Sequence, residues 1–255
     1  MNATLTDTPI LTFDQITPDQ WGRLANTRVF FAHQSVGGNL LDGIADILRE
    51  RSDIGLNIVE IKNKTQVNGP AFYHAVVGRN GEPSTKLRAF NEMVAEVGDS
   101  GIALLKYCYA DFSHGTDATQ LFEEYRQTVA SIRAQHPRLQ IVHVTVPLVT
   151  DAGTLRHFAA VVRSKPPARE VNFIRHQYNE LMRRTYQGKE PIFDLARLES
   201  TNVDGNPVGF RYKGERVQAL APAWTTDGGH LNETARRRIA KAFLVTLVTI
   251  YDEAS

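Results

Sequence analysis

Short runs rich in β-branched and aromatic residues alternate along this chain with longer segments whose apolar residues recur at helical spacing. This alternation limits the possible folds more than any other feature. The short runs predict strands at 27–32, 56–61, 101–109, 139–148 and 191–195. The longer segments predict helices at 39–51, 84–97, 119–135, 171–186 and 232–251. Five strand-and-helix units in succession are typical of an α/β fold, in which a mostly parallel five-stranded sheet is covered by helices on both faces.

No internal repeat, low-complexity segment or linker divides the 255 residues. We therefore expect one domain over 27–251, preceded by an N-terminal extension at 1–26. Within this domain 199–229 is the least regular segment, with glycine, proline, asparagine and aromatic residues in no periodic order. Loops of this length in compact domains are usually functional or mobile. The sequence leaves open whether this one forms a lid over a site.

Composition excludes several classes of function. Hydrophobic residues make up 42% of the chain, enough for a buried core, and a net charge of +1 provides no field that attracts nucleic acid or an anionic membrane. The single cysteine, Cys108, can form neither an internal disulfide nor a zinc site with a second cysteine. The first residues show no secretory leader, and the longest apolar stretch, 242–251, is about half of a membrane span. We expect a cytoplasmic protein of open oligomeric state, although a trimmed secreted form would look the same.

Polar residues at the ends of the predicted strands are the candidates for chemistry, because ligands of open parallel sheets bind beyond the carboxyl ends of the strands. Ser35 follows the first strand, in the segment FFAHQSVGGN between strand and helix. A serine here has its hydroxyl at the sheet edge and its N–H at a helix N-terminus, where negative charge is favoured. Serine is also a preferred helix N-cap, so a purely structural role is the alternative.

A serine nucleophile needs a base, and His230 in WTTDGGHLNETA is the candidate. Asp227 lies three residues earlier, and the two glycines between them allow a tight turn that brings the carboxylate to the imidazole. This spacing is weakly specific, because Asp111 and His114 form a second copy of it. Position favours the first pair, which adjoins the closing helix, whereas the second pair follows the central strand.

The order of these elements resembles that of the SGNH/GDSL family of esterases and lipases over about residues 27–251, with HQSVGGN and DGGHLN as the specific anchors. The resemblance implies a flavodoxin-like three-layer α/β/α sandwich. It also implies a catalytic triad of Ser35 as nucleophile, His230 as base and Asp227 as acid, acting without a cofactor.

Two blocks differ from the family pattern. HQS replaces the usual Gly-Asp-Ser, and Ala110 occupies the position of the asparagine that donates to the oxyanion hole. The expected hole is formed by the backbone N–H groups of Ser35 and Gly81, with Gly78 as the alternative glycine. Either Tyr109 or another nearby group replaces the asparagine, or the hole is weaker. One lost donor typically reduces the rate by about 100- to 1000-fold.

His33, Asp111 and Trp224 are further candidates to line a substrate pocket. Carboxylate and imidazole groups also bind divalent metals, but the acidic and histidine residues of this chain show no tight ligand spacing, so we expect no metal site. The possible ligands are Asp111, His114, His143 and Asp151. His143 lies within a predicted strand, where a hydrogen-bonded core histidine is expected. The arginines at 236–238 point to different sides of a helix and predict a solvated surface rather than a nucleic-acid site.

The sequence therefore predicts a serine esterase that transfers an acyl group to water through an acyl-enzyme. The family resemblance implies short acyl esters, such as acetyl groups on carbohydrate, so the expected partner is a small-molecule or carbohydrate ester. Two alternatives stay open. One is an acyltransferase with the same triad, and the other, suggested by Ala110, is a catalytically impaired binding protein on the same fold.

Overall fold

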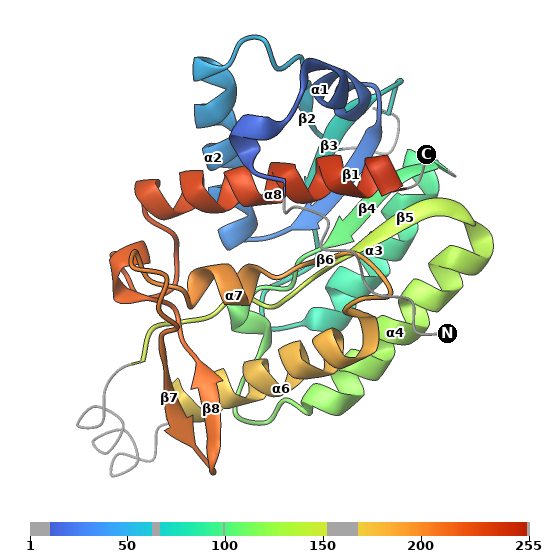
Figure 1. Cartoon of the computed structure of the whole chain (residues 1–255). Coiled ribbons are helices and arrows are strands. Elements are labelled where there is room, and N and C mark those ends of the chain that lie inside the picture. The colour runs from blue at the N-terminus through green and yellow to red at the C-terminus, as the bar shows by residue number, and fades with distance from the viewer. Residues whose placement is uncertain (1–10, 63–66, 99, 152–167, 254–255) are drawn as a thin grey trace, which may run out of the picture.

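The computed structural model describes residues 11–62, 67–98, 100–151 and 168–253, which form a central sheet of six parallel strands between two layers of helices (Figure 1). The strands are β1 (Arg28–His33), β2 (Ile58–Glu60), β3 (Ala71–Val76), β4 (Ser100–Leu105), β5 (Arg138–Val144) and β6 (Ile192–Phe193). Their order across the sheet is β2-β3-β1-β4-β5-β6. The α/β class and the parallel sheet predicted from the alternation are confirmed, with six strands in place of five.

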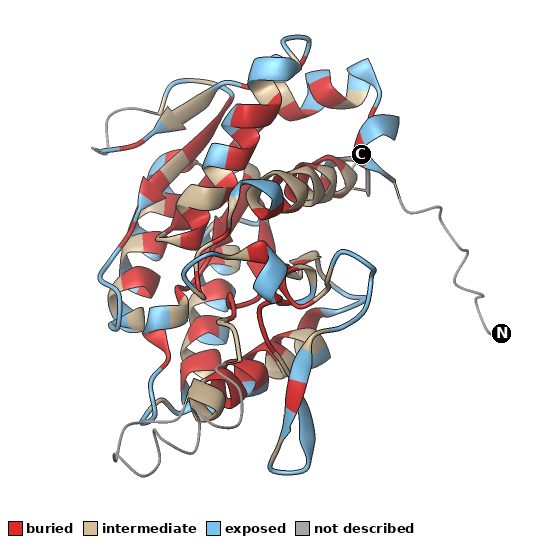
Figure 2. Ribbon diagram, turned by 90° about the vertical axis from the view of Figure 1, so that its left-hand side faces the viewer, coloured by how far each residue is buried: buried red, intermediate tan, exposed pale blue. Residues whose placement is uncertain are grey.

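The helices divide between the two faces of the sheet. One face is covered by α1 (Pro18–Ala25), α2 (Val36–Glu50) and α8 (Glu233–Glu253), and the other by α3 (Pro83–Val97), α4 (Ala118–Gln135) and α6 (Ala168–Tyr186). Within β1, Phe31 packs in the α2 core and Phe30 in the α3 core, because successive strand residues point to opposite faces. Figure 2 shows the buried residues concentrated in the strands and on the inward sides of the helices. Burial on both faces explains the uninterrupted apolar run VFFA in β1.

Within the six-stranded sheet, β3 is the strand that the sequence pattern does not predict. Its six residues include His74, and a glycine and a proline directly precede it. Parallel pairing with β2 on one side and β1 on the other stabilises it, so tertiary pairing overrides a weak local signal. As a consequence, the loop that carries Gly78 and Gly81 follows the strand beside β1 and not the edge strand β2.

The segment 199–229 is folded, although its sequence has no clear period. It follows α7 (Leu195–Glu199), forms an antiparallel hairpin of β7 (Gly209–Tyr212) and β8 (Glu215–Gln218), and ends near a 3₁₀ helix, η4 (Pro222–Trp224). Lys213 and Gly214 form the two-residue turn, with positive φ angles of 49° and 86°. Strands of four residues are too short for their alternation to stand out in the sequence.

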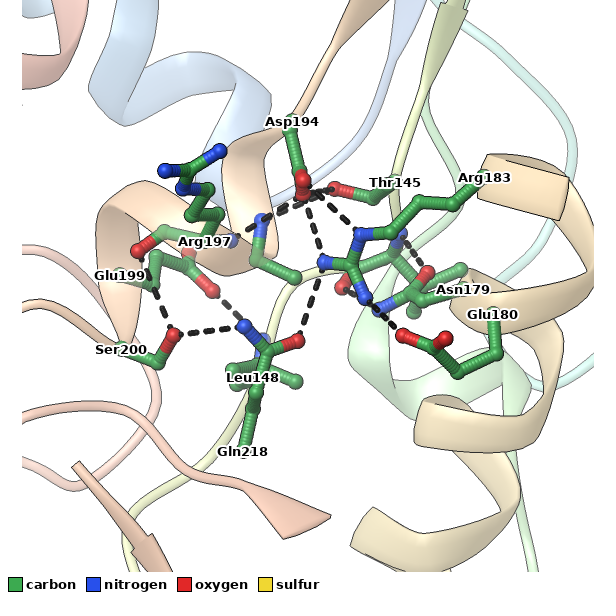
Figure 3. Close-up of polar contacts among 12 residues, drawn as sticks. Thr145, Leu148, Asn179, Glu180, Arg183, Asp194, Arg197, Glu199, Ser200 and Gln218 are labelled. Carbon is green, nitrogen blue, oxygen red and sulfur yellow. Dashed lines mark hydrogen bonds and ion pairs between the residues drawn. The ribbon is translucent and has the colours of Figure 1, made fainter. Parts of the chain in front are cut away.

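A partly buried polar network holds this segment against α6 (Figure 3). Asp194, directly after β6, accepts two hydrogen bonds from Arg183 of α6, at 2.9 and 2.7 Å. Arg183 also donates to the side chain of Gln218 in β8 at 3.0 Å, and Gln218 donates to the hydroxyl of Ser200 at 3.0 Å. Satisfied networks of this kind rigidify a structure, so the hairpin is attached firmly to the body of the domain.

Residues 13–25, which we expect to belong to an extension, pack on the core. The 3₁₀ helix η1 (Phe13–Gln15) and α1 contact α8, and Phe13 and Trp21 belong to the apolar cluster on that face of the sheet. Residues 1–10 lie outside the described part of the chain, and a domain boundary at 27 stays a prediction. Among the described helices, none combines the length and the apolar character needed to cross a bilayer.

Candidate active site

Ser35 lies at the carboxyl end of β1, directly before α2. Its φ of 50° and ψ of −111° are rare for a residue other than glycine, and such a conformation costs on the order of 1–3 kcal/mol. The side chain makes no capping hydrogen bond to α2. Its hydroxyl oxygen lies 2.7 Å from Nε2 of His230 instead. The capping role that the sequence allowed is therefore not the one observed, and strain of this kind is typical of functional positions.

His230 and Asp227 occupy a tight turn before α8. Nδ1 of His230 lies 2.6 Å from a carboxylate oxygen of Asp227, which assigns a proton to Nδ1 and leaves Nε2 to accept from the Ser35 hydroxyl. The second carboxylate oxygen accepts the backbone N–H groups of Gly229 and His230, at 2.9 and 2.8 Å. These two hydrogen bonds, and then the one from the imidazole, hold the pKa of Asp227 well below its ordinary value. The three side chains thus form one hydrogen-bonded relay.

Packing of α8 against α2 brings the two loops together across 195 positions of sequence. Gly43 of α2 permits the close approach, because a Cβ there would lie 2.4 Å from the backbone oxygen of Arg236 in α8. Asn39 of α2 accepts the N–H of Leu231 at 3.1 Å, which attaches the histidine turn to the helix after the serine. The relay is therefore a product of helix packing.

The second Asp-x-x-His segment forms no comparable pair. Asp111 is buried and lies 2.6 Å from Nζ of Lys86, a residue of α3. His114 is exposed and contacts Glu170 of α6 at 2.9 Å. The structure thus places only one of the two copies beside Ser35.

Two expectations for the loops around the serine need correction. Gly81, the first choice for an oxyanion donor, already uses its N–H in a hydrogen bond to Asp111 at 3.0 Å. Asp111 does not line an open pocket, since it is 3% exposed and both of its oxygens are occupied. One of them accepts the ammonium of Lys86 at 2.6 Å and the N–H of Cys108 at 2.7 Å. Asp111 therefore joins the loops after β3 and β4 from the inside.

The alternative glycine, Gly78, has different properties. Its φ is 58°, and its N–H makes no hydrogen bond within the described part of the chain. Gln34, which replaces the aspartate of the usual family block, donates to the carbonyl oxygens of Val77 and Gly78 at 2.9 and 2.6 Å. This amide ties the Gly78 loop to the residue before Ser35.

Tyr109 stands beside the relay. Its hydroxyl oxygen lies 3.5 Å from Nε2 of His230, and the two rings meet edge to face with 5.7 Å between their centroids. Burial raises the pKa of Tyr109, so the hydroxyl remains protonated and can donate. A Cβ on Gly229 would lie 3.1 Å from the tyrosine ring, so a glycine there leaves room for it. Ala110, the next residue, is exposed and has no side-chain donor.

Arg175 of α6 contacts this region, and the sequence does not identify it. Its side chain is buried and donates through Nε and Nη2 to the backbone oxygen of Tyr109, at 3.1 and 2.9 Å. The same helix contains the arginines at 169, 183 and 184, and nothing in the local pattern distinguishes Arg175 from them. Only the packing of α6 against the loop after β4 reveals the contact.

The other two pocket candidates, His33 and Trp224, lie inside the protein, so these expectations are wrong. His33 is 3% exposed, and burial, followed by the neighbouring His74, lowers its pKa to about 3. Its Nε2 lies 3.2 Å from Nδ1 of His74. Trp224 is 4% exposed and donates its indole N–H to the backbone oxygen of Thr201 at 2.6 Å. Neither side chain lines an open pocket.

Within the described residues, no three histidine, cysteine or acidic side chains lie together in a way that could hold a metal ion. His143 is the core histidine that the sequence predicts. Tyr125 and Glu190 lie 2.7 Å from its two ring nitrogens, and burial lowers its pKa to about 4. Asp151 pairs with Arg169 at 2.7 Å.

Solved structures share this fold. The chain is similar, over 100% of both chains, to a Bacteroides fragilis protein provisionally named an acylhydrolase, with a TM-score of 0.53 and 14% identity. It is also similar to a provisionally named GDSL-like lipase from Parabacteroides merdae, with a TM-score of 0.50 and 15% identity over 87% of this chain and 95% of the lipase. A third similar structure is a Streptococcus pneumoniae protein provisionally named a platelet activating factor. Its TM-score is 0.50 at 12% identity, over 95% of this chain and 94% of that protein. No family model and no curated protein matches the chain. At these identities the likeness establishes the fold, which is that of SGNH/GDSL hydrolases.

Proposed function

On this SGNH/GDSL hydrolase fold, we propose that the chain is a serine esterase with Ser35 as nucleophile, His230 as general base and Asp227 as the acid that orients the base. The relay carries the proposal, with 2.7 Å from the serine oxygen to Nε2 and 2.6 Å from Nδ1 to the carboxylate. Both distances are in hydrogen-bond range before any substrate binds, and this geometry activates a serine hydroxyl. The acylhydrolase and lipase names of structures with the same fold support a hydrolase.

In the proposed reaction, Nε2 of His230 takes the proton of Ser35 as the serine oxygen attacks the ester carbonyl carbon. The Asp227 carboxylate keeps the Nδ1 proton in place and stabilises the imidazolium that forms. The imidazolium then protonates the leaving alcohol, and an acyl-serine remains. Water, deprotonated by the same nitrogen, attacks this acyl group, releases the acid and restores the serine. The steps use protein side chains and water, with no cofactor.

The oxyanion of each tetrahedral intermediate needs donors, because the family's asparagine is missing. We assign this role to the N–H groups of Ser35 and Gly78 and to the hydroxyl of Tyr109. Neither N–H makes a hydrogen bond within the described residues, and the N-terminus of α2 favours negative charge. The Tyr109 hydroxyl interacts with both Ser35 and Nε2 of His230, which supports its role in place of the asparagine.

The solvent exposure of the relay is compatible with an ester whose alcohol group is large. The side chains of His230 and Asp227 are 44% and 54% exposed, so a leaving group can approach Nε2 directly from solvent. A carbohydrate ester can present a short acyl group, such as acetyl, to Ser35 without entering a deep pocket. We propose short acyl esters of this kind as substrates.

Hydrolysis of p-nitrophenyl acetate by the wild-type protein and by Ser35→Ala tests the proposal. We expect p-nitrophenol release by the wild type and only background release by the variant. Equal background rates would contradict an esterase and favour a binding protein on this fold. Turnover that increases when an alcohol acceptor is added would instead identify an acyltransferase with the same triad.

A further inference from the structure

Three cationic side chains, Lys86, Lys106 and Arg175, are buried near the loop after β4, and among the described residues only Lys86 forms an ion pair. Lys86 of α3 forms an ion pair with Asp111 at 2.6 Å, and neither side chain is exposed. Arg175 of α6 is 5% exposed, and no carboxylate of the described residues lies within ion-pair distance of it. Burial of an unpaired charge is unfavourable, so the position of Arg175 calls for a physical explanation.

The guanidinium of Arg175 is directed at the backbone of Tyr109. Nε and Nη2 form a fork on the Tyr109 carbonyl oxygen, at 3.1 and 2.9 Å, and the guanidinium carbon lies 5.9 Å from the centroid of the tyrosine ring. The remaining nitrogen, Nη1, donates to the side-chain oxygen of Asn172 at 2.7 Å. Asn172 in turn donates to the backbone oxygen of Val149 at 2.9 Å, so the guanidinium is itself held in place.

The charge of Arg175 strengthens this contact. A hydrogen bond from an ionised donor is roughly twice as strong as a neutral one, and a forked contact restrains the acceptor in two directions. Glu199, at the end of α7, attracts Arg175 from a longer distance, but burial raises the pKa of Glu199 to about 8. The guanidinium is therefore held mainly by its hydrogen bonds to the Tyr109 carbonyl and to Asn172.

We infer that Arg175 is a positioning residue, which holds the backbone of Tyr109 so that the tyrosine hydroxyl stays beside Ser35 and His230; this inference rests on the esterase proposed above. The short 3₁₀ helix η3 (Tyr109–Asp111) is held on two sides. Arg175 donates to the carbonyl of its first residue, Tyr109, and Lys86 pairs with the side chain of its last residue, Asp111. The hydroxyl lies 3.5 Å from Nε2, at the limit of a hydrogen bond, so a small displacement of the backbone removes the interaction.

Two substitutions separate the charge of Arg175 from its pair of hydrogen bonds to the Tyr109 carbonyl. Arg175→Lys keeps the charge and loses the forked contact, whereas Arg175→Met loses both. We expect kcat to fall about 10-fold in the lysine variant and about 100-fold in the methionine variant, with KM within about three-fold of the wild type in both. Arg183→Lys is the matched control, because Arg183 lies on the same helix and forks onto Asp194 in the network of Figure 3. It should lower the melting temperature and leave kcat within about three-fold.

A double-mutant cycle with Tyr109→Phe decides between positioning and general destabilisation. In the phenylalanine background, Arg175→Met should reduce kcat by less than about three-fold, because the hydroxyl that Arg175 positions is already gone. Losses that multiply in full would overturn the inference. If the methionine variant does not fold, Arg175→Lys takes its place in the cycle with the same two outcomes.

Failure of the esterase proposal gives a different result. If the wild type and Ser35→Ala release p-nitrophenol at the same background rate, the proposed function is wrong. Crystal structures of the wild type and of R175K then decide the role of Arg175 independently of turnover. A Tyr109 hydroxyl displaced from His230 would support the positioning role, and an unmoved ring would overturn it.

Discussion

Replacing Tyr109 by phenylalanine removes a single oxygen atom and tests the most unusual part of the proposed site. The ring contacts with His230, at 5.7 Å between centroids, and with the guanidinium of Arg175, at 5.9 Å, need no hydroxyl and are kept. The backbone oxygen that Arg175 binds is also unchanged. The substitution therefore separates the donor function of the hydroxyl from the packing of the side chain.

The geometry predicts a small effect on folding and a large one on catalysis. In the free protein the hydroxyl is 3.5 Å from Nε2, so this weak contact contributes about 0.5 kcal/mol or less to the free energy of unfolding. In the tetrahedral intermediate the same hydroxyl donates to a full negative charge. Loss of one such donor costs about 2.7–4 kcal/mol, or roughly 100- to 1000-fold in kcat. Because Tyr109 is only partly buried, water replaces some of this interaction, and we expect about 100-fold with KM within about three-fold.

Steady-state hydrolysis of p-nitrophenyl acetate, with thermal unfolding in parallel, measures both effects. Tyr107→Phe is the matched control, because it is the same change two residues earlier, at a buried hydroxyl without a hydrogen-bond partner in the described structure. That control should keep kcat and unfold at the same or a higher temperature. A Tyr109→Phe protein with kcat within about three-fold of the wild type would refute the role of the hydroxyl, and the hole would then depend on backbone donors alone.

The remaining predictions concern the base, its acid, the second Asp-x-x-His segment and the Lys86–Asp111 pair. The value of kcat/KM should fall in acid, since a protonated imidazole at His230 cannot accept the serine proton, and a flat profile would argue against a histidine base. Asp227→Asn should reduce kcat by about 1000-fold or more through loss of the correct tautomer. The folded protein holds the pKa of Asp227 below its reference value of 3.8. The hydrogen bonds of this carboxylate should therefore stabilise the fold fully above pH 3.8 and lose their effect only in stronger acid. Acid unfolding of the wild type and of Asp227→Asn measures this difference. His114→Ala should leave kcat within about three-fold, and a large loss would mean that the other Asp-x-x-His pair is the active one. Lys86→Met leaves Asp111 buried without its partner and should lower the free energy of unfolding in urea by about 3–5 kcal/mol, whereas an unchanged midpoint would show that the pair is not stabilising.

The elements that the sequence predicted and those it missed differ in where their stability comes from. The strand β1 is buried on both faces, and the resulting apolar run is visible without any knowledge of its partners. The strand β3 contains His74 and depends on β2 and β1 on either side, so its local signal is weak. The hairpin of β7 and β8 is likewise defined by its own pairing and by its packing on Phe173 of α6.

The same distinction applies to the side chains around the serine. Gly81 and Asp111 were both plausible as site residues, because each follows a strand at the correct edge of the sheet. The structure shows that the N–H of Gly81 donates to the buried carboxylate of Asp111, and this contact joins residues 30 positions apart. Arg175 was not a candidate at all, since its partner Tyr109 lies 66 positions away.

The sequence by itself determined the class of fold and the chemical groups available to the site. It was sufficient for the turn of Asp227 and His230, because every hydrogen bond within that turn joins residues no more than three positions apart. Only the tertiary structure decided that this histidine, and not His114, meets Ser35. That contact spans 195 positions and exists because α8 packs against α2, and the packing of two complete helix surfaces is not encoded in any local pattern.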